Sequence, residues 1–341
     1  MTDEEVADML LRHFNGDQDA KAKKKNKLLE PYVHKSNVDF DEEGFPNVDA
    51  LRQAISKLPR QILGNNSKME HTGGGKAIAA NVGIPALHGL VVDKDTGQFA
   101  HVNTCPGAGQ CKLFCYAMKG SYIQFKGVSM AQTQKLNLLL NDPVSFKRIL
   151  SAEISVRKHQ AAFKDASFIV RWHDSGDFFS EEYARLGFEI ANEHPDVLFT
   201  AYTKMASVNN SKAPKNFVFT FSADSAHPSQ VAQVDVRNAK VSVVVPRELF
   251  TDLTNQPKGE LIEYNSPEAL QTLKDRLYRR YGQEYDIIKD RISTYDDMMS
   301  YPQGVNFPEG KKYAVIVIPG NGDDAANYNR DDVKVIFLLI H

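Results

Sequence analysis

The sequence contains few cysteines and no long apolar run. Only three of its 341 residues are Cys, and an odd number of thiols does not form a complete disulfide framework. No stretch approaches the roughly 20 consecutive apolar residues that a membrane-spanning helix needs. The N-terminus, Met-Thr-Asp-Glu-Glu, lacks the apolar core of a signal peptide. We therefore expect a cytoplasmic protein with no membrane partner.

The chain also lacks a strong charge of either sign. It has 41 basic and 43 acidic residues, for a net charge of -2. This net charge does not indicate a protein whose whole surface attracts nucleic acid. A local basic groove is still compatible with it. The share of hydrophobic residues, 42%, is typical of a globular chain with a filled core.

The N-terminal part of the chain differs in composition from the rest. Residues 1–62 are polar and charged, with a lysine-rich run at 21–27 and an amphipathic stretch at 48–58. We expect a helical, partly flexible cap there, followed by a single α/β domain over 63–341. The glycine-rich segment that ends at Lys76 lacks the form of a phosphate-binding loop, because Ala77 follows the lysine.

The remaining sequence alternates between strand-like and helix-like patterns. Such alternation predicts a mainly parallel sheet, which could be an open doubly wound sheet or a (β/α) barrel. We favour a (β/α) barrel or partial barrel with a helical N-terminal extension. The pattern predicts a hairpin at 89–103, helices at 128–140, 143–163 and 181–193, a helical block inserted at 267–300, and strands at 167–172, 197–202, 216–222, 240–246, 313–318 and 333–340.

Polar residues follow each predicted strand. In both architectures the carboxyl ends of parallel strands gather the chemistry, so these residues are expected to share one pocket. They are Cys105 to Cys115 after the hairpin, then His173 to Asp177, Thr203 with Lys204, Ser222 to His227, and Pro246 with Arg247.

All three thiols lie in one glycine-rich loop, at Cys105, Cys111 and Cys115. With His101 or His173 they would make a Cys3His zinc site. Alone they would hold a 4Fe-4S cluster and leave one iron without a protein ligand. The first gap of five residues exceeds the two to four of structural zinc sites, which favours the cluster over zinc and over three unmetallated thiols.

Several blocks of sequence resemble a phage protein family called gene product 88-like. The resemblance begins near Gly83 and covers about three-quarters of the chain. It implies an origin in a bacteriophage or prophage, and the family brings no settled biochemical function. The blocks that carry it lie at 104–117, 171–180, 199–204, 216–222, 320–326 and 337–341.

The arrangement is more distantly similar to radical S-adenosylmethionine (SAM) enzymes, in which a three-cysteine loop follows the first barrel strand. Their usual spacing is C-x3-C-x2-C, whereas this loop reads C-x5-C-x3-C. The resemblance implies that Asp177 receives the SAM amine and that Lys204 binds its carboxylate or ribose. It also points to His173 and Asp174 as catalytic residues. The other cofactor-binding candidates are Phe114, Tyr116, Ser175, Gly176, Tyr202 and Ser222.

Three classes of function follow from these observations. The leading hypothesis is a phage iron-sulfur enzyme, radical SAM-like, that cleaves SAM and modifies a nucleotide, a nucleic acid or a host component. The second is a zinc-binding barrel protein that transfers groups to nucleobases or binds nucleic acid without redox chemistry. The third is a phage interaction protein with a degenerate, catalytically silent site. For the enzyme, Tyr202, Asp224 and His227 are weaker candidates at the rim.

Overall fold

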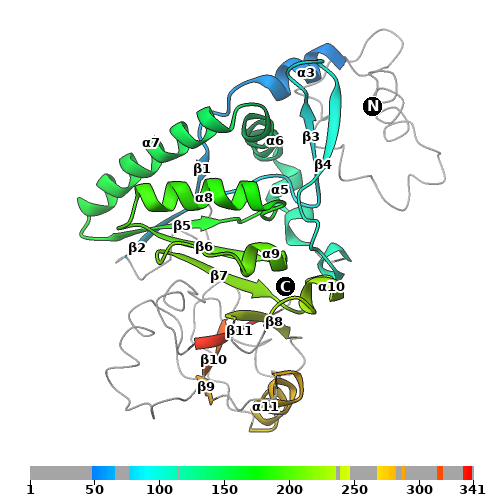
Figure 1. Ribbon diagram of the computed structural model, residues 1–341, viewed down its shortest axis with the longest axis vertical. Coiled ribbons are helices and arrows are strands. Elements are labelled where there is room, and N and C mark those ends of the chain that lie inside the picture. Colours follow the sequence, from blue (N-terminus) through cyan, green and yellow to red (C-terminus); the bar gives the residue numbers. More distant parts are fainter. Residues whose placement is uncertain are drawn as a thin grey trace, which may run out of the picture.

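The computed structural model describes residues 48–65, 77–113, 115–235, 239–245, 267–281, 286–288, 313–317 and 333–339. Within these ranges the chain forms a large sheet, a separate hairpin and a layer of helices (Figure 1). The predictions for residues 1–47 and for Lys76, Phe114, Pro246 and Arg247 lie outside the described residues.

One sheet of nine strands organises the molecule. Its order is β1-β2-β5-β6-β7-β8-β11-β10-β9, and every neighbouring pair is parallel except β1 with β2. The strands are β1 Leu63–Gly64, β2 Ala77–Val82, β5 Ser167–Trp172, β6 Leu198–Thr203, β7 Phe217–Ser222, β8 Val241–Val245, β9 Asp286–Ile288, β10 Tyr313–Val317 and β11 Val333–Leu339.

The mainly parallel α/β sheet is confirmed, but the sheet is open, so the expected barrel or partial barrel is not confirmed. Strands β2, β5, β6, β7 and β8 lie side by side in chain order, as they would in a barrel. The order then reverses, because β9 lies at the far edge and the chain returns through β10 to β11 beside β8. In the described part of the chain the edge strands β1 and β9 do not pair with each other, and they have only two and three residues.

The strand that leads into the cysteine loop belongs to a separate hairpin. β3 (His88–Val92) pairs antiparallel with β4 (Phe99–Asn103), and Asp93 accepts main-chain N–H groups of the turn from Asp95 and Thr96. This corrects the expectation that the loop follows a strand of the main sheet. The first parallel strand is instead β2, which the sequence pattern did not predict.

Two helices and a hairpin form a small second core. α3 (Val48–Ser56) and α6 (Lys126–Asn141) enclose the hairpin. The residues of this core are Leu51, Ile55, Leu90, Val92, Phe99 and Met130. α6 is thereby held beside the site described below.

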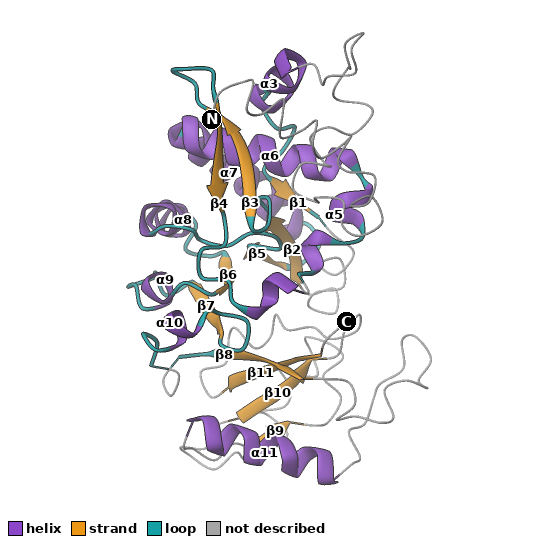
Figure 2. Cartoon of the chain, turned by 90° about the vertical axis from the view of Figure 1, so that its right-hand side faces the viewer, coloured by secondary structure: helices purple, strands orange, loops and turns teal. Residues whose placement is uncertain are grey.

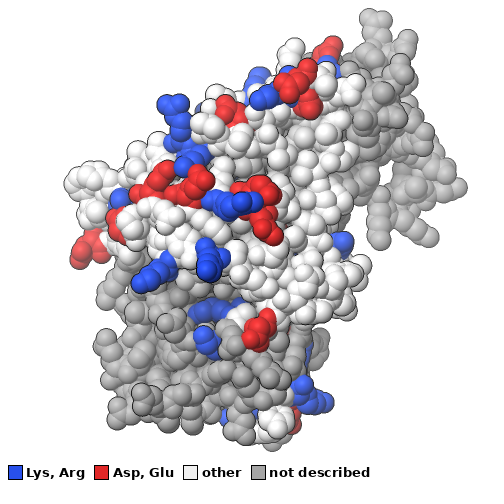
Figure 3. Space-filling view, in the orientation of Figure 1, with Lys and Arg blue, Asp and Glu red and all other residues white. Residues whose placement is uncertain are grey.

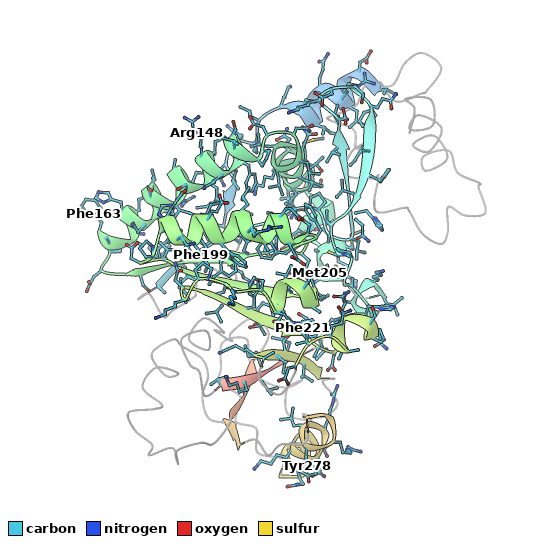
Figure 4. The ribbon with its side chains drawn as sticks, viewed as in Figure 1. Arg148, Phe163, Phe199, Met205, Phe221 and Tyr278 are labelled. Carbon is cyan, nitrogen blue, oxygen red and sulfur yellow. The ribbon has the colours of Figure 1, made fainter. Side chains whose placement is uncertain are left out.

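The main core lies between the sheet and the helices α7 (Pro143–Ala162) and α8 (Glu181–Glu193). Asp142 caps α7 and Ser180 caps α8, each accepting a main-chain N–H of the first turn. Trp172, Phe199 and Phe217 fill the layer beneath them, and the position of Phe199 is seen in Figure 4. Burial of each such ring contributes about 2–3 kcal/mol, which makes this layer the main support of the strand ends.

The C-terminal elements extend the same sheet. α11 (Pro267–Tyr281) is followed by β9, so the predicted helical block over 267–300 ends earlier than expected and gives way to a strand. β9 forms because its Asp-Ile-Ile segment pairs in parallel with β10 from Tyr313 to Val315. β11 lies between β8 and β10, so the last strand is an interior one, as its apolar run predicts.

Candidate functional site

The cysteine loop crosses the carboxyl ends of the parallel strands, which face the viewer in Figure 2. The main-chain N–H of Asp177, after β5, donates to the carbonyl of Thr104 at 3.1 Å. The N–H of Gly109 donates to the carbonyl of Ser225, after β7, at 2.8 Å. The predicted meeting of the cysteine loop with these strand ends is thus confirmed, although the loop enters from the hairpin.

Two glycines let the loop lie directly on the strand ends. A side chain at Gly107 would overlap the main-chain carbonyl of Lys204, and one at Gly109 would overlap that of Ala226. Only glycine permits so close an approach of two backbones. The Pro-Gly-Ala-Gly sequence between Cys105 and Cys111 therefore fixes where the thiols stand.

The three thiols differ in exposure. Cys105 is 8% exposed, and its sulfur accepts the main-chain N–H of Leu87 at 3.3 Å. Cys111 and Cys115 are partly exposed. Burial raises the pKa of Cys105 to about 12 and also raises the pKa of Cys111, while the charge of Lys204 acts in the opposite direction on both.

Lys204 supplies positive charge to this group. Burial alone lowers the pKa of its ammonium, but Asp177 and the three cysteines together raise that pKa above its ordinary value. Lys204 is therefore protonated at neutral pH and interacts electrostatically with all three thiols. The sequence placed Lys204 at this rim, and the structure puts its charge among the cysteines.

The Asp177 carboxylate connects the end of β5 to the end of β6 through hydrogen bonds to main-chain N–H groups. Its Oδ2 accepts the main-chain N–H of Lys204 at 2.8 Å, and its Oδ1 accepts that of Phe178 at 2.7 Å. The side chain is 1% exposed, and burial raises its pKa. Both carboxylate oxygens are thus engaged by the protein's own backbone.

His173 is part of a buried hydrogen-bond chain. Trp172 Nε1 donates to the Tyr183 hydroxyl at 2.9 Å, and that hydroxyl lies 2.7 Å from His173 Nε2. Burial, with a smaller effect of Lys204, lowers the pKa of His173 to about 3, so the ring is neutral. A neutral ring carries one proton, so one of its nitrogens donates and the other accepts, and the second nitrogen, Nδ1, has no hydrogen-bond partner among the described residues.

Asp174 has a carboxylate oxygen without a hydrogen-bond partner in the described structure. Its side chain is 7% exposed, Oδ2 accepts the Tyr122 hydroxyl at 3.1 Å, and Oδ1 is the unpartnered atom. The Tyr116 hydroxyl donates to the main-chain carbonyl of Asp174. Lys135 of α6 is buried nearby; burial lowers its pKa, and the charge of Asp174 partly offsets this effect. Asp174 therefore has one buried carboxylate oxygen, packed against Gly83, that no donor of the described residues satisfies.

The other predicted cofactor-binding residues occupy different positions around this edge. Gly176 has φ of +84° and packs against Ile84, so it shapes the turn after β5. Ser175 is buried beside it, and its hydroxyl has no partner among the described residues. The Tyr202 ring lies 5.0 Å from the Arg171 guanidinium.

Other candidates have side-chain partners elsewhere in the protein. Ser222 Oγ accepts a hydrogen bond from Ser242 Oγ at 3.4 Å between β7 and β8. Asp224 forms an ion pair with Arg276 of α11 at 2.9 Å, and the His227 side chain caps α10 (Pro228–Val231) while its main-chain N–H donates to the carbonyl of Gly107 in the cysteine loop. His101 is exposed on β4.

The sequence did not indicate several residues that complete the site. Tyr122 and Lys135 reach Asp174 from α5 (Ser121–Gln124) and α6. The spacing of residues in the sequence does not predict that these two side chains lie near the end of β5. Their position depends on α6, which is held in place by its contacts with the hairpin core. On the sheet face opposite α7 and α8, the side-chain oxygens of Asn81, Thr200 and Thr220 are buried and without partners in the described part of the chain.

The described side chains do not form a ready single-ion site. Among the residues that the structure describes, no three His, Cys, Asp or Glu side chains are grouped so that they could hold one metal ion. His173 Nε2 is engaged by Tyr183, and His101 is exposed on β4, the strand that leads into the loop. The three thiols share one loop and one electrostatic environment without converging on a single point.

Comparisons with known proteins point to phage sequences. The family model described as Gene product 88 matches residues 57–285. The Gene 88 protein of Mycobacterium phage L5 is 30% identical over 164 residues, which are 45% of this chain and 62% of that protein. The match thus spans less than two thirds of that relative. No solved structure matches the chain. Among the described helices, none is both long and apolar enough to cross a lipid bilayer.

Proposed function

This chain belongs to the gene product 88 family, and from that premise we propose that it is a phage-type iron-sulfur enzyme of the radical SAM kind. It would act in the cytoplasm of an infected or prophage-bearing bacterium. The proposal is supported chiefly by one observation: three thiols and the Lys204 ammonium share the carboxyl edge of a parallel sheet.

The donor set suits a cluster better than a single zinc ion. Zinc needs four donors within about 2.0–2.3 Å of one point, and the described side chains do not converge in that way. In a 4Fe-4S cluster each cysteine binds a different iron, so the sulfurs stand further apart. Cys105, Cys111 and Cys115 would be the three protein ligands.

The surroundings of the thiols support the same assignment. Lys204 would offset the negative charge of bound thiolates, and the N–H of Leu87 already donates to the Cys105 sulfur. Hydrogen bonds of this kind tune the potential of a cluster. Asp177 would position Lys204 through its main-chain bond.

A 4Fe-4S cluster held by Cys105, Cys111 and Cys115 would supply one electron, received from an external reductant of the cell, for reductive cleavage of the SAM sulfonium. The protein would bind and orient SAM. Asp177 is poorly suited to receive the amine, because backbone N–H groups occupy both of its oxygens. Asp174 Oδ1 is the better acceptor, and the Tyr116 ring, 49% exposed, offers a face for adenine. His173 would donate a hydrogen bond from Nδ1 and keep its ring neutral.

The first experiment measures iron, sulfide and visible absorbance of the protein purified without oxygen. We expect a coloured protein that loses iron and sulfide when Cys105, Cys111 or Cys115 is replaced by Ser. Lys212→Ala, at an exposed lysine before β7, is the control and should retain both. A colourless protein with one zinc and no sulfide would overturn the proposal and favour the zinc-binding alternative.

The second experiment measures SAM binding to cluster-loaded protein by calorimetry. Asp174→Asn should weaken binding about tenfold or more, because a charge-assisted hydrogen bond to a buried acceptor is lost. Asp95→Asn, on the exposed hairpin turn, should bind as the parent does. Unchanged affinity in Asp174→Asn would remove Asp174 from the SAM site and leave the cluster assignment intact.

A further inference from the structure

A long stretch of the chain around the cysteine loop carries no acidic residue. From Thr96 to Asn141 there is no Asp or Glu, although 43 of the 341 residues are acidic. The same stretch contains Lys112, Lys119, Lys126 and Lys135. In Figure 3 the carboxylates gather on the helical layer and at the top, whereas the described surface on the right, where the loop lies, is mostly white.

Large apolar side chains are exposed within this stretch. Leu113 is 86% exposed and Phe125 is 60% exposed, with Tyr116 between them in sequence. Lys112 and Lys119 are exposed as well. We call the described residues 110–113 and 115–127 the edge segment. Exposed apolar groups that cluster on a soluble protein, with charges of one sign beside them, indicate a binding surface.

From this combination we propose that the edge segment binds single-stranded nucleic acid. Lys112 and Lys119 form no ion pair with a carboxylate of the described residues, so they can attract phosphates. Exposed rings such as Phe125 provide faces on which unstacked bases pack. A duplex would satisfy the lysines but hides the faces of its bases. An acidic peptide would likewise use the charges and leave the rings without planar partners.

The edge segment lies next to the candidate site. Tyr116 belongs both to the segment and to the site, since its hydroxyl bonds the carbonyl of Asp174. A strand bound along the segment would therefore pass beside the cysteine loop. The inference needs no cluster, because exposed side chains carry it. Where the proposed function also holds, it identifies a polynucleotide as the substrate class.

The test is fluorescence anisotropy of the full-length protein with labelled oligothymidylate and oligouridylate over a range of salt concentrations. We expect binding that weakens as salt rises. Lys112→Ala with Lys119→Ala should reduce the slope of log affinity against log salt by about 1.4, since each phosphate contact on a single strand contributes about 0.7. Phe125→Ala should weaken binding about fivefold to a hundredfold, the effect of losing one stacked base.

Matched controls are available elsewhere on the surface. Lys212→Ala with Lys215→Ala removes two exposed lysines before β7, and Phe163→Ala removes an 81% exposed ring. Figure 4 shows Phe163 at the end of α7 far from Met205, which lies against the loop glycine Gly107. These variants should bind as the parent does.

Three results would overturn the inference: no binding at low salt, equal losses in the edge and control variants, or equal affinity for a duplex of the same length. Circular dichroism of each variant separates a lost contact from a lost fold. Measuring iron-loaded and iron-free protein separates this inference from the proposed function. If protein that never takes up iron binds the single-stranded oligonucleotide, the edge segment is supported as a binding surface and the iron-sulfur enzyme assignment fails.

Discussion

The carboxylate of Asp177 accepts the main-chain N–H of Lys204 at 2.8 Å, which joins the turn after β5 to the end of β6. The N–H of Asp177 in turn donates to Thr104, at the start of the cysteine loop. One buried acid thus connects three segments that are distant in sequence. It places the Lys204 charge and the first thiol in fixed relation to each other.

Replacing Asp177 by Ala should lower the free energy of unfolding by about 2–4 kcal/mol. The change leaves two buried N–H donors, of Lys204 and Phe178, without their charged acceptor. Urea denaturation followed by circular dichroism measures the effect. Asp95→Ala on the hairpin turn should change stability by less than about 0.5 kcal/mol. A loss of similar size in both variants would contradict the role given to Asp177.

The buried His173 should make stability depend on pH. Its pKa in the folded protein, about 3, lies below the 6.5 of an unperturbed histidine, so the unfolded chain takes up the proton first as pH falls. Its contribution is complete above about pH 6.5 and is lost as pH falls toward 3. Over that window the parent should lose about 1.4 kcal/mol per pH unit more than His173→Gln. Parallel curves of unfolding free energy for the two proteins would exclude this role.

Gly107→Ala should disturb the placement of the thiols. The added methyl group would overlap the carbonyl of Lys204, and neither backbone can move without shifting the loop. We expect less iron bound per chain and a lower midpoint of thermal unfolding. Gly127→Ala is the matched control, because nothing lies within reach of its new methyl group and alanine favours a helix. Equal iron content in the two variants would show that the close contact at Gly107 is dispensable.

Arg276→Ala should loosen α11 from the sheet. Arg276 pairs with Asp224 at 2.9 Å and donates to the carbonyl of Val244 at 3.3 Å. The arginine is partly exposed, so solvent screening limits the loss to about 1–2 kcal/mol. Limited proteolysis should cut near α11 sooner in this variant than in the parent. Arg279→Ala, one turn further along the helix and exposed, should keep the cleavage rate of the parent.

Local pattern predicted several elements closely. β5 at 167–172 and α8 at 181–193 have the limits expected from their apolar patterns and, for α8, from the Ser180 cap. β2 was not predicted, because Ala77–Val82 is short and rich in alanine, a residue with weak strand preference. β9 was also missed, since its three residues form a strand only by pairing with β10.

Of the site, the sequence by itself determined the residues that follow each strand and the concentration of all thiols in one glycine-rich loop. Alternating patterns record which residues are buried, so they predicted a parallel sheet with its chemistry at the carboxyl edge. Tertiary structure alone decided that the sheet is open, because strand order depends on pairings between distant segments. It also decided that backbone N–H groups occupy both oxygens of Asp177 and leave one oxygen of Asp174 unpartnered among the described residues. Two acids three positions apart differ in this way because the availability of a carboxylate depends on the backbone amides that the fold brings to it.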